Sequence, residues 1–194
     1  MISFENISFS IAGRTLVKNS TVSIPNGHKV GLVGRNGTGK TSLFRLIYGE
    51  ITLDNGNLKL SKNLRVGGVS QEAPGNSITL INTVLAADQE RTDLLQKAQI
   101  EKDPLKISEI QTRLTDIDAW SAEARASTIL NGLGFDKHKQ KLACSEFSGG
   151  WRMRVALAAV LFSKPELLLL DEPSNYLDLE GTIWLQAYIS QYPS

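Results

Sequence analysis

The chain has 194 residues, of which 41% are hydrophobic and 21% charged, a balance that allows a folded domain with a real core. Its 21 basic side chains stand against 20 acidic ones, a net charge of +1 that gives no reason to expect a nucleic-acid or membrane-surface binder. The longest apolar run, Val155 to Phe162, has 8 residues, far short of the roughly 20 that span a bilayer. The N-terminus lacks the pattern of a signal peptide, and the single cysteine, Cys144, fits a reducing compartment. We therefore expect a cytoplasmic protein with no integral membrane segment.

The first third of the chain predicts strands around one helix. Polarity alternates along two segments near the N-terminus, and turn-forming residues separate them. A continuous apolar stretch then leads into a glycine-rich loop, which is typical of a buried strand followed by a helix. The expected elements are strands at 2–9 and 21–24, a buried strand at 29–34, a helix from Thr41 to about Tyr48, and short strands at 58–60 and 65–69.

Helical periodicity dominates the remainder. Apolar residues three and four apart predict two helices joined at Pro104, an arm-like hairpin at about 79–120 within a helical subdomain at about 79–147. The other expected elements are a helix at 119–130, a basic loop at 137–141, a helix from Ser148 to about Phe162, an apolar strand at 167–170 and a helix from about Leu179 to Ser190. Trp120, Trp184 and Tyr188 lie at helical spacings and are expected to pack. No linker or repeat is visible, so residues 1–194 are expected to form one domain.

Residues 34–41 fit the phosphate-binding pattern G-x-x-x-x-G-K-S/T, after an expected strand and before an expected helix. The glycines let successive backbone N–H groups point at phosphate oxygens, and the helix adds the positive end of its dipole. Lys40 is expected to reach the β- and γ-phosphates, and Thr41 a magnesium ion. The alternative is a glycine-rich turn with an accidental Gly-Lys-Thr, which the flanking strand and helix disfavour.

The apolar run at 167–170 ends in Asp171 and Glu172. An acid at the end of a buried strand lies at the carboxyl edge of a parallel sheet, where α/β folds bind ligands. Asp171 would hold magnesium, directly or through water, and Glu172 would orient or deprotonate an attacking water. Alone, the segment also fits a buried strand with a polar end. Behind a phosphate loop, it favours a nucleotide-hydrolysing site.

A second anion-binding geometry lies at residues 148–154, where a serine and two glycines open a helix. Alone, Ser-Gly-Gly also fits a helix cap. Between a phosphate loop and an apolar strand that ends in Asp-Glu, it resembles the signature motif of the ATP-binding cassette (ABC) family. In that family two cassettes pair head to tail, and each signature serine touches the γ-phosphate held by the partner cassette.

The resemblance covers nearly the whole chain and implies an α/β fold: a P-loop NTPase with an ABC ATPase core, a small antiparallel β subdomain and a helical subdomain. It implies ATP and Mg²⁺ as cofactors, with Glu172, Gln71 and Lys40 as catalytic residues. Gln71 looks like the Q-loop glutamine, and Asp178 like the D-loop aspartate that aligns the two sites; a solvated loop residue and a helix cap are the alternatives. The implied nucleotide-binding residues are Gly34, Arg35, Asn36, Gly37, Thr38, Gly39, Lys40, Thr41, Ser42, Ser148, Gly149, Gly150 and Asp178, and the implied metal-binding residues are Thr41, Gln71 and Asp171.

Within the family, Trp151-Arg152-Met153-Arg154 after the signature glycines resembles the ABC-F branch, and the match extends to its bacterial Uup-like members. Members of that branch have no membrane domain and act on ribosomes. The 77 residues from Gln71 to Ser148 leave room for the two-helix arm that the branch inserts there.

Two features depart from the family pattern. The position of its adenine-stacking aromatic falls near Ile11, so either Phe9 substitutes for it or base stacking is weak. The switch histidine, expected about thirty residues past Glu172, has no counterpart, because His28 and His138 both precede that point. We therefore expect the N-terminal cassette of a longer protein, incomplete at its C-terminus, that hydrolyses ATP weakly alone.

The resemblance implies an ATPase of the cytoplasm that acts on the ribosome, as a translation or ribosome-assembly factor. ATP would close this cassette against a second one, from the same full-length chain or a homodimer copy. The alternatives are the ATP-binding subunit of a membrane transporter and a module that only binds ATP. Residues 137–141 form either a solvated loop or a contact to ribosomal RNA. The expected arm at 79–120, with eight acidic and five basic side chains, does not resemble an RNA clamp.

Overall fold

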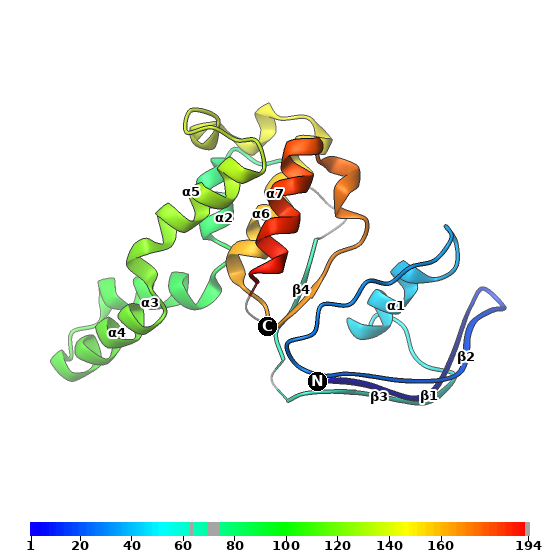
Figure 1. Ribbon diagram of the computed structural model, residues 1–194. Helices are drawn as coiled ribbons and strands as arrows, with labels where there is room; N and C mark the ends of the chain where they lie inside the picture. The colour runs from blue at the N-terminus through cyan, green and yellow to red at the C-terminus, as the bar shows by residue number, and fades with distance from the viewer. Residues whose placement is uncertain (63, 70–73, 193–194) are drawn as a thin grey trace. The chain divides into compact units, whose positions relative to one another are not determined.

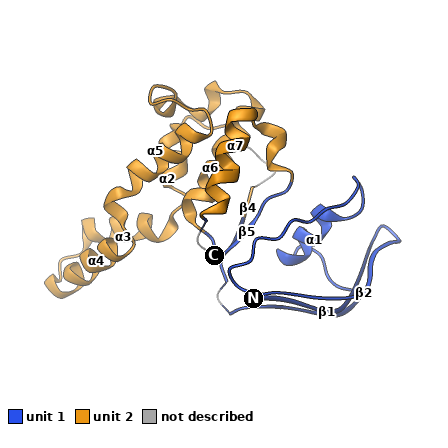
Figure 2. Ribbon diagram, viewed as in Figure 1, with its two compact units in different colours: residues 1–67, 165–171, 192–194 blue, residues 68–164, 172–191 orange. Residues whose placement is uncertain are grey.

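The computed structural model describes residues 1–62, 64–69 and 74–192. It divides into two compact units, which Figure 2 colours separately. Unit 1 comprises Met1–Gly67, Pro165–Asp171 and Tyr192–Ser194; unit 2 comprises Gly68–Lys164 and Glu172–Gln191.

Unit 1 is built on a three-stranded antiparallel sheet (Figure 1) with the order β2-β1-β3. The strands are β1 (Ile2–Ile11), β2 (Arg14–Ile24) and β3 (Asn55–Leu60). The central strand has the alternation expected of a half-buried strand, because Ile2, Phe4, Ile7 and Phe9 are all buried. Ile2 lies opposite Ile24 on one side and Leu60 on the other. This sheet is the small antiparallel unit that the sequence predicts.

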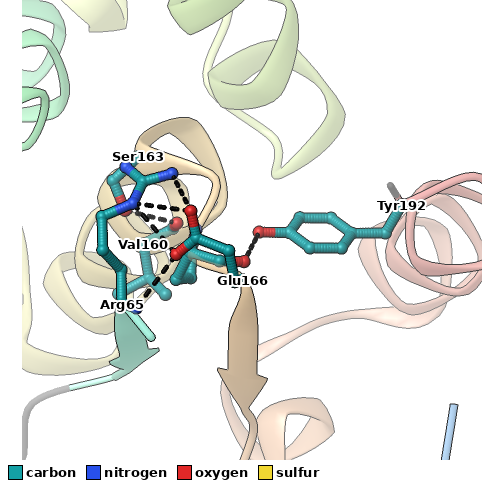
Figure 3. A network of polar contacts seen from close by, with 6 residues as sticks. Arg65, Val160, Ser163, Glu166 and Tyr192 are labelled. Atoms are coloured by element: carbon teal, nitrogen blue, oxygen red, sulfur yellow. Dashed lines mark hydrogen bonds and ion pairs between the residues drawn. The ribbon is translucent and has the colours of Figure 1, made fainter. Parts of the chain in front are cut away.

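The helix α1 (Lys40–Ile47) and the strand β5 (Leu167–Leu169) bury residues in the same core as β1. β5 pairs with β4 (Val66–Gly68) in a separate two-stranded sheet. At the start of β5, the Arg65 guanidinium lies 2.9 Å from the Glu166 carboxylate, as Figure 3 shows. This contact holds the pKa of the Glu166 carboxyl below its ordinary value. The Tyr192 hydroxyl donates to the Pro165 carbonyl at 2.9 Å. The two residues before β5, Pro165 and Glu166, are thus each held by a polar contact.

Unit 2 is helical. Its α-helices are α2 (Leu80–Leu85), α3 (Gln89–Ile100), α4 (Pro104–Asp116), α5 (Ala122–Gly132), α6 (Gly149–Ser163) and α7 (Leu179–Ser190). Short 3-10 turns lie between them: η1 (Ala119–Ser121), η2 (Lys139–Lys141), η3 (Cys144–Glu146) and η4 (Pro173–Tyr176). Helices α2, α5 and α6 pack against one another, and α3 packs against α4 as the predicted hairpin.

The core of unit 2 consists of side chains with no exposed surface. They come from α2, α4, α5 and α6 and from the segments that follow α5: Leu80, Val84, Leu114, Ala126, Leu130, Leu133, Phe135, Cys144, Val155 and Leu161. Trp184 and Tyr188 stack at 5.1 Å on α7, which confirms that these two rings pack. Trp120 is 65% exposed, so the prediction that it packs is wrong.

The structure corrects two expected elements. Residues 29–34 are exposed and form no strand within the described chain, with Val33 96% exposed. A buried parallel strand exists only where neighbours hydrogen-bond to it, and the described strands pair elsewhere. The hairpin also begins later than expected, because the helix ends after α2 and a new helix, α3, begins. The Asp88 side chain caps α3 by accepting a hydrogen bond from the Arg91 backbone amide.

Gly132 allows the close packing of α5 against α7. A Cβ atom built at Gly132 would lie 2.0 Å from the Trp184 ring. We expect Gly132→Ala to lower the free energy of unfolding by about 1–3 kcal/mol, because the ring or the helix must shift. Urea denaturation measures the effect. Asn131→Ala, on the exposed face of the same helix, is the control and should stay within about 0.5 kcal/mol of the parent protein. Equal stability of the two variants would contradict this packing.

Candidate nucleotide-binding site

The loop before α1 has the backbone conformation that its glycines permit. Gly37 and Gly39 have φ angles of +77° and +101°, in the left-handed region that side chains disfavour. Gly34 has no such angle but has no room for a side chain, since a Cβ atom there would lie 2.8 Å from the Thr38 hydroxyl. Three glycines of the predicted phosphate loop are therefore required by the fold of the loop itself.

Polar contacts inside the loop hold its curvature. The Thr38 hydroxyl donates to the Arg35 carbonyl at 2.8 Å, and the Thr38 amide donates to the same oxygen at 3.3 Å. The Lys40 ammonium donates to the carbonyls of Gly34 at 2.9 Å and Arg35 at 3.3 Å. The lysine thus lies against the loop, at the position from which an ammonium can exchange carbonyl oxygens for those of a phosphate.

The loop meets the end of β5 through one hydrogen bond across 130 residues of sequence. The Thr41 hydroxyl donates to Asp171 Oδ2 at 2.5 Å, and both residues belong to unit 1. Two of the three residues that the sequence predicts to bind the metal are therefore in contact, although they lie on separate elements. Both groups are exposed, so a ligand can reach them.

The oxygen pair at Thr41 and Asp171 fits a magnesium ion. Mg²⁺ binds oxygen ligands and is usually held by one or two protein groups together with substrate phosphates and water. The described residues contain no group of three or more His, Cys, Asp or Glu side chains that could hold a metal ion. Asn36 is exposed in the loop, and Ser42 follows Thr41 in α1.

Several predicted site residues lie outside unit 1. Gln71 lies outside the described residues, so its role as catalytic and metal-binding residue stays a prediction. Glu172 and Asp178 belong to unit 2, as do the signature residues 148–150. The structure therefore brings Gly34 to Ser42 together with Asp171 within unit 1.

Ser148 occupies the N-cap position of α6. In the described structure its side chain accepts no capping hydrogen bond from that helix. Ser148, Gly149 and Gly150 are all exposed. The first N–H groups of the helix are thus accessible next to a serine hydroxyl, which suits an oxyanion better than the alternative of a simple helix cap.

Glu172 has a positive φ of 46°, a conformation that costs a residue with a side chain free energy. It opens the turn η4, where the Asn175 amide N–H donates to the Glu172 carboxylate at 2.9 Å. An unusual backbone at a candidate catalytic acid, held by a neighbouring side chain, is typical of a site where orientation matters.

Asp178 caps α7 and also contacts the signature helix. Its Oδ1 accepts from the Gly181 amide at 2.8 Å, so the helix-cap interpretation is confirmed. Its Oδ2 lies 2.9 Å from Arg154 Nη1 on α6. The Gly181 amide, and then the Arg154 guanidinium, hold the pKa of the Asp178 carboxyl below its ordinary value.

Arg154 and Asn175 contact the candidate site residues Asp178 and Glu172, but the sequence analysis gave neither a role in the site and used Arg154 only for its resemblance to the ABC-F branch. The spacing offered a signal for Arg154, because it lies three residues after Trp151 on the same helical face, and its guanidinium lies 4.3 Å from that ring. For Asn175 the only signal in the sequence was its position, three residues after Glu172. The base-stacking alternative at Phe9 is wrong, because its side chain is fully buried in the core of unit 1 and has no face to offer a ligand.

Comparisons with known proteins agree with this geometry. A family model described as ABC transporter matches residues 17–175. The "Probable ATP-binding protein YheS" of Haemophilus influenzae is 42% identical over 195 residues, which cover 99% of this chain and 31% of the relative. "ATP-binding cassette sub-family F member 3" of Homo sapiens is 40% identical over 204 residues, which cover 100% of this chain and 28% of the relative. The chain thus spans less than a third of the length of these relatives.

Solved structures show the same fold. An ATP binding subunit of an ABC transporter superimposes with a TM-score of 0.71 at 15% identity, covering 100% of this chain and 75% of that one. A bacterial ABC transporter cassette, solved as a dimer, gives a TM-score of 0.65 at 18% identity, covering 98% of this chain and 82% of that one. The predicted α/β class with an ABC ATPase core is confirmed.

The fold and the phosphate loop define an ATP-binding cassette. On the match of the family model and on identities of 40% or more to YheS and to sub-family F proteins, the chain belongs to the ABC family, in its F branch. In the part of the chain that the structure describes, none of the helices is long and apolar enough to cross a membrane.

Lys40 tests the site directly. We expect Lys40→Ala to weaken binding of a non-hydrolysable ATP analogue at least about tenfold, because a lost hydrogen bond to a charged group costs about 1.5–3 kcal/mol. Isothermal titration calorimetry measures the affinity. Lys18→Ala, on the exposed face of β2 in the same unit, should leave it unchanged. Equal affinities for both variants would place the nucleotide elsewhere.

Proposed function

We propose that this chain is the ATP-binding and ATP-hydrolysing cassette of a cytoplasmic ABC-F protein that acts on the ribosome. ATP closes the cassette head to tail against a second cassette, and hydrolysis reopens the pair. The observation that carries the proposal is the contact of Thr41 with Asp171 beside the curled loop at 34–39. That contact supports a site for a metal-bound triphosphate.

The loop and α1 supply binding. The backbone N–H groups of residues 34–41 and the N-terminus of α1 favour phosphate oxygens, and Lys40 adds a positive charge. Thr41 and Asp171 would hold Mg²⁺, which neutralises charge on the phosphates when it is bound. Base recognition is expected to be weak, because Phe9 is buried and the position near Ile11 is not aromatic.

Glu172 supplies the chemistry. It follows Asp171 directly in the chain, so its Cα lies about 3.8 Å from that of the metal-binding residue. Its exposed carboxylate is oriented by Asn175 and can accept a proton from an attacking water. Gln71 completes the proposed catalytic set.

Ser148, the N-cap residue of α6, makes no capping hydrogen bond with its side chain, and this supports the pairing of two cassettes. An exposed Ser148 hydroxyl with free helix N–H groups suits the γ-phosphate of ATP that is bound to a second cassette. Because each site then takes one half from its partner, the 194-residue chain by itself should bind ATP and turn it over slowly. The γ-phosphate favours the closed pair over the open one.

The choice of the ribosome rests on the branch. The relatives with 40% identity or more include YheS and proteins named as members of sub-family F, and Trp151 after the signature glycines agrees with that branch. Contact to ribosomal RNA could involve the exposed Lys137 and Lys141 in the basic loop.

The test is ATP trapping. Glu172→Gln in the full-length natural protein should bind ATP, hydrolyse it at least about a hundredfold more slowly and hold the closed state, because the general base is lost. We expect this variant to co-sediment with ribosomes in ATP, and the parent protein to co-sediment far less. The matched control is Glu180→Gln, on the exposed first turn of α7, which should behave as the parent protein does.

Two outcomes would contradict the proposal. Full ATP turnover by Glu172→Gln would remove Glu172 from the chemistry. A trapped variant that co-purifies with a membrane protein, and not with ribosomes, would instead favour the ATP-binding subunit of a transporter.

A further inference from the structure

Arg154 is a buried charge at the centre of unit 2. It lies on α6, six residues after Ser148, and its side chain is only 11% exposed. A guanidinium cannot lose its proton in a protein, so burying it is costly unless every part of its fork finds a partner. The contacts of Arg154 therefore indicate what the buried charge is for.

Those contacts converge on the segment between Glu172 and α7. Arg154 Nε donates to the Tyr176 carbonyl at 2.6 Å, and Nη1 donates to Asp178 Oδ2 at 2.9 Å. Nη1 also donates to the Leu133 carbonyl, after α5, at 3.3 Å. The face of the guanidinium lies on the Trp151 ring, 4.3 Å from its centroid. One side chain thus fixes two points of the 176–178 segment to the signature helix.

The segment that Arg154 holds begins at the candidate catalytic acid. Asn175, directly before Tyr176, donates its side-chain amide to the Glu172 carboxylate at 2.9 Å. The turn from Glu172 to Asn175 is closed by a hydrogen bond that the Asn175 backbone N–H donates to the Glu172 carbonyl at 3.1 Å. Because Glu172 has a positive φ, its backbone needs support from its surroundings. Arg154 contacts the chain at the Tyr176 carbonyl, one residue beyond Asn175.

We propose that Arg154 is a positioning residue of the ATPase, which acts through the Tyr176 carbonyl and Asn175 to hold the Glu172 carboxylate in its catalytic orientation. This inference rests on the proposed function, because it takes Glu172 as the general base. It assigns to the signature helix a second task besides contact with nucleotide, namely to set the base of its own cassette.

A purely structural role is the alternative, and Arg125 offers a matched control for it. Arg125 lies on α5 in the same unit, with a side chain that is 25% exposed and paired with Asp118 at 2.9 Å. It also lies over an aromatic ring, that of Phe162, at 5.5 Å. Both arginines therefore join an ion pair to a ring, but Asp118 and Phe162, the partners of Arg125, lie outside the segment at 172–178.

The first experiment compares Arg154→Lys with Arg125→Lys in the full-length natural protein. Lysine keeps the charge, but its single nitrogen cannot occupy both positions from which Nε and Nη1 of Arg154 contact the Tyr176 carbonyl and Asp178. We expect Arg154→Lys to lower kcat at least about tenfold with KM for ATP within about twofold, because orientation is lost and binding is not. Arg125→Lys should leave both constants within about twofold of the parent.

Hydrogen exchange supplies a readout without ATP. Amides of the turn at 174–177, including those that close it at Asn175 and Leu177, should exchange faster in Arg154→Lys and not in Arg125→Lys. If kcat falls while exchange in this turn stays as in the parent, Arg154 does not act through the turn, and the inference is overturned.

The second experiment uses the exposed Asn175, whose replacement should not disturb folding. We expect Asn175→Ala to lower kcat about fivefold or more at unchanged KM. The double variant with Arg154→Lys should lose no more than Arg154→Lys does, because both act on one carboxylate. Multiplied effects of the two changes would mean that they act independently, and would overturn the inference.

The failure of this inference and that of the proposed function give different results. If the parent protein does not hydrolyse ATP, or if Glu172→Gln retains full turnover, the proposed function fails and the inference with it. If Glu172→Gln is inactive but Arg154→Lys and Asn175→Ala keep the parent kcat, only the inference fails.

Discussion

The hydrogen bond between Thr41 and Asp171 is the interaction on which the account of the site depends. It joins the first turn of α1 to the end of β5, two elements that are 130 residues apart in sequence. Each end is fixed by its own surroundings. The positive φ of Gly39 sets the start of α1, and the contacts of Glu166 and Pro165 with Arg65 and Tyr192 set the start of β5. The Thr41 hydroxyl and the Asp171 carboxylate thus meet beside the loop at 34–39, where we propose that the triphosphate lies.

Unit 2 has a different organising centre. Its core is apolar, and Arg154 is one of the few buried polar side chains among the described residues. A buried guanidinium must satisfy its hydrogen-bond donors. Arg154 does so by donating to the Tyr176 carbonyl and to Asp178, and these contacts hold the loop after Glu172. Stability of the unit and orientation of the candidate base are therefore served by the same contacts. A residue at such a point tolerates even conservative replacement poorly.

The sequence predicted those features that depend on near neighbours in the chain. The phosphate loop is local, because Gly37, Gly39 and Lys40 act within a few residues of one another. The alternation along β1 and the cap at Asp178 are local in the same sense. The pairing of Thr41 with Asp171 was predicted only as a consequence of the motifs that contain them.

The features that were missed depend on distant partners. Residues 29–34 have the apolar pattern of a buried strand, but a strand is defined by what pairs with it, and the described strands pair elsewhere. The break before α3 lies inside an unbroken spacing of three and four residues from Val84 to Ala98, and a single cap at Asp88 outweighs it. Arg154 looks like one more basic residue of a helix, since its partners at Leu133, Tyr176 and Asp178 come from two other parts of the chain.

The central claim is that Thr41 and Asp171 together hold the magnesium of bound ATP, and the most direct test is the magnesium dependence of ATP affinity. Calorimetry with and without Mg²⁺, on the parent protein and on Thr41→Val, Asp171→Asn and the double variant, gives the contribution of the metal in each. The account predicts a gain from Mg²⁺ of about tenfold or more in the parent, and its loss in either single variant with no further loss in the double variant. A full gain retained in Thr41→Val or in Asp171→Asn would contradict the account.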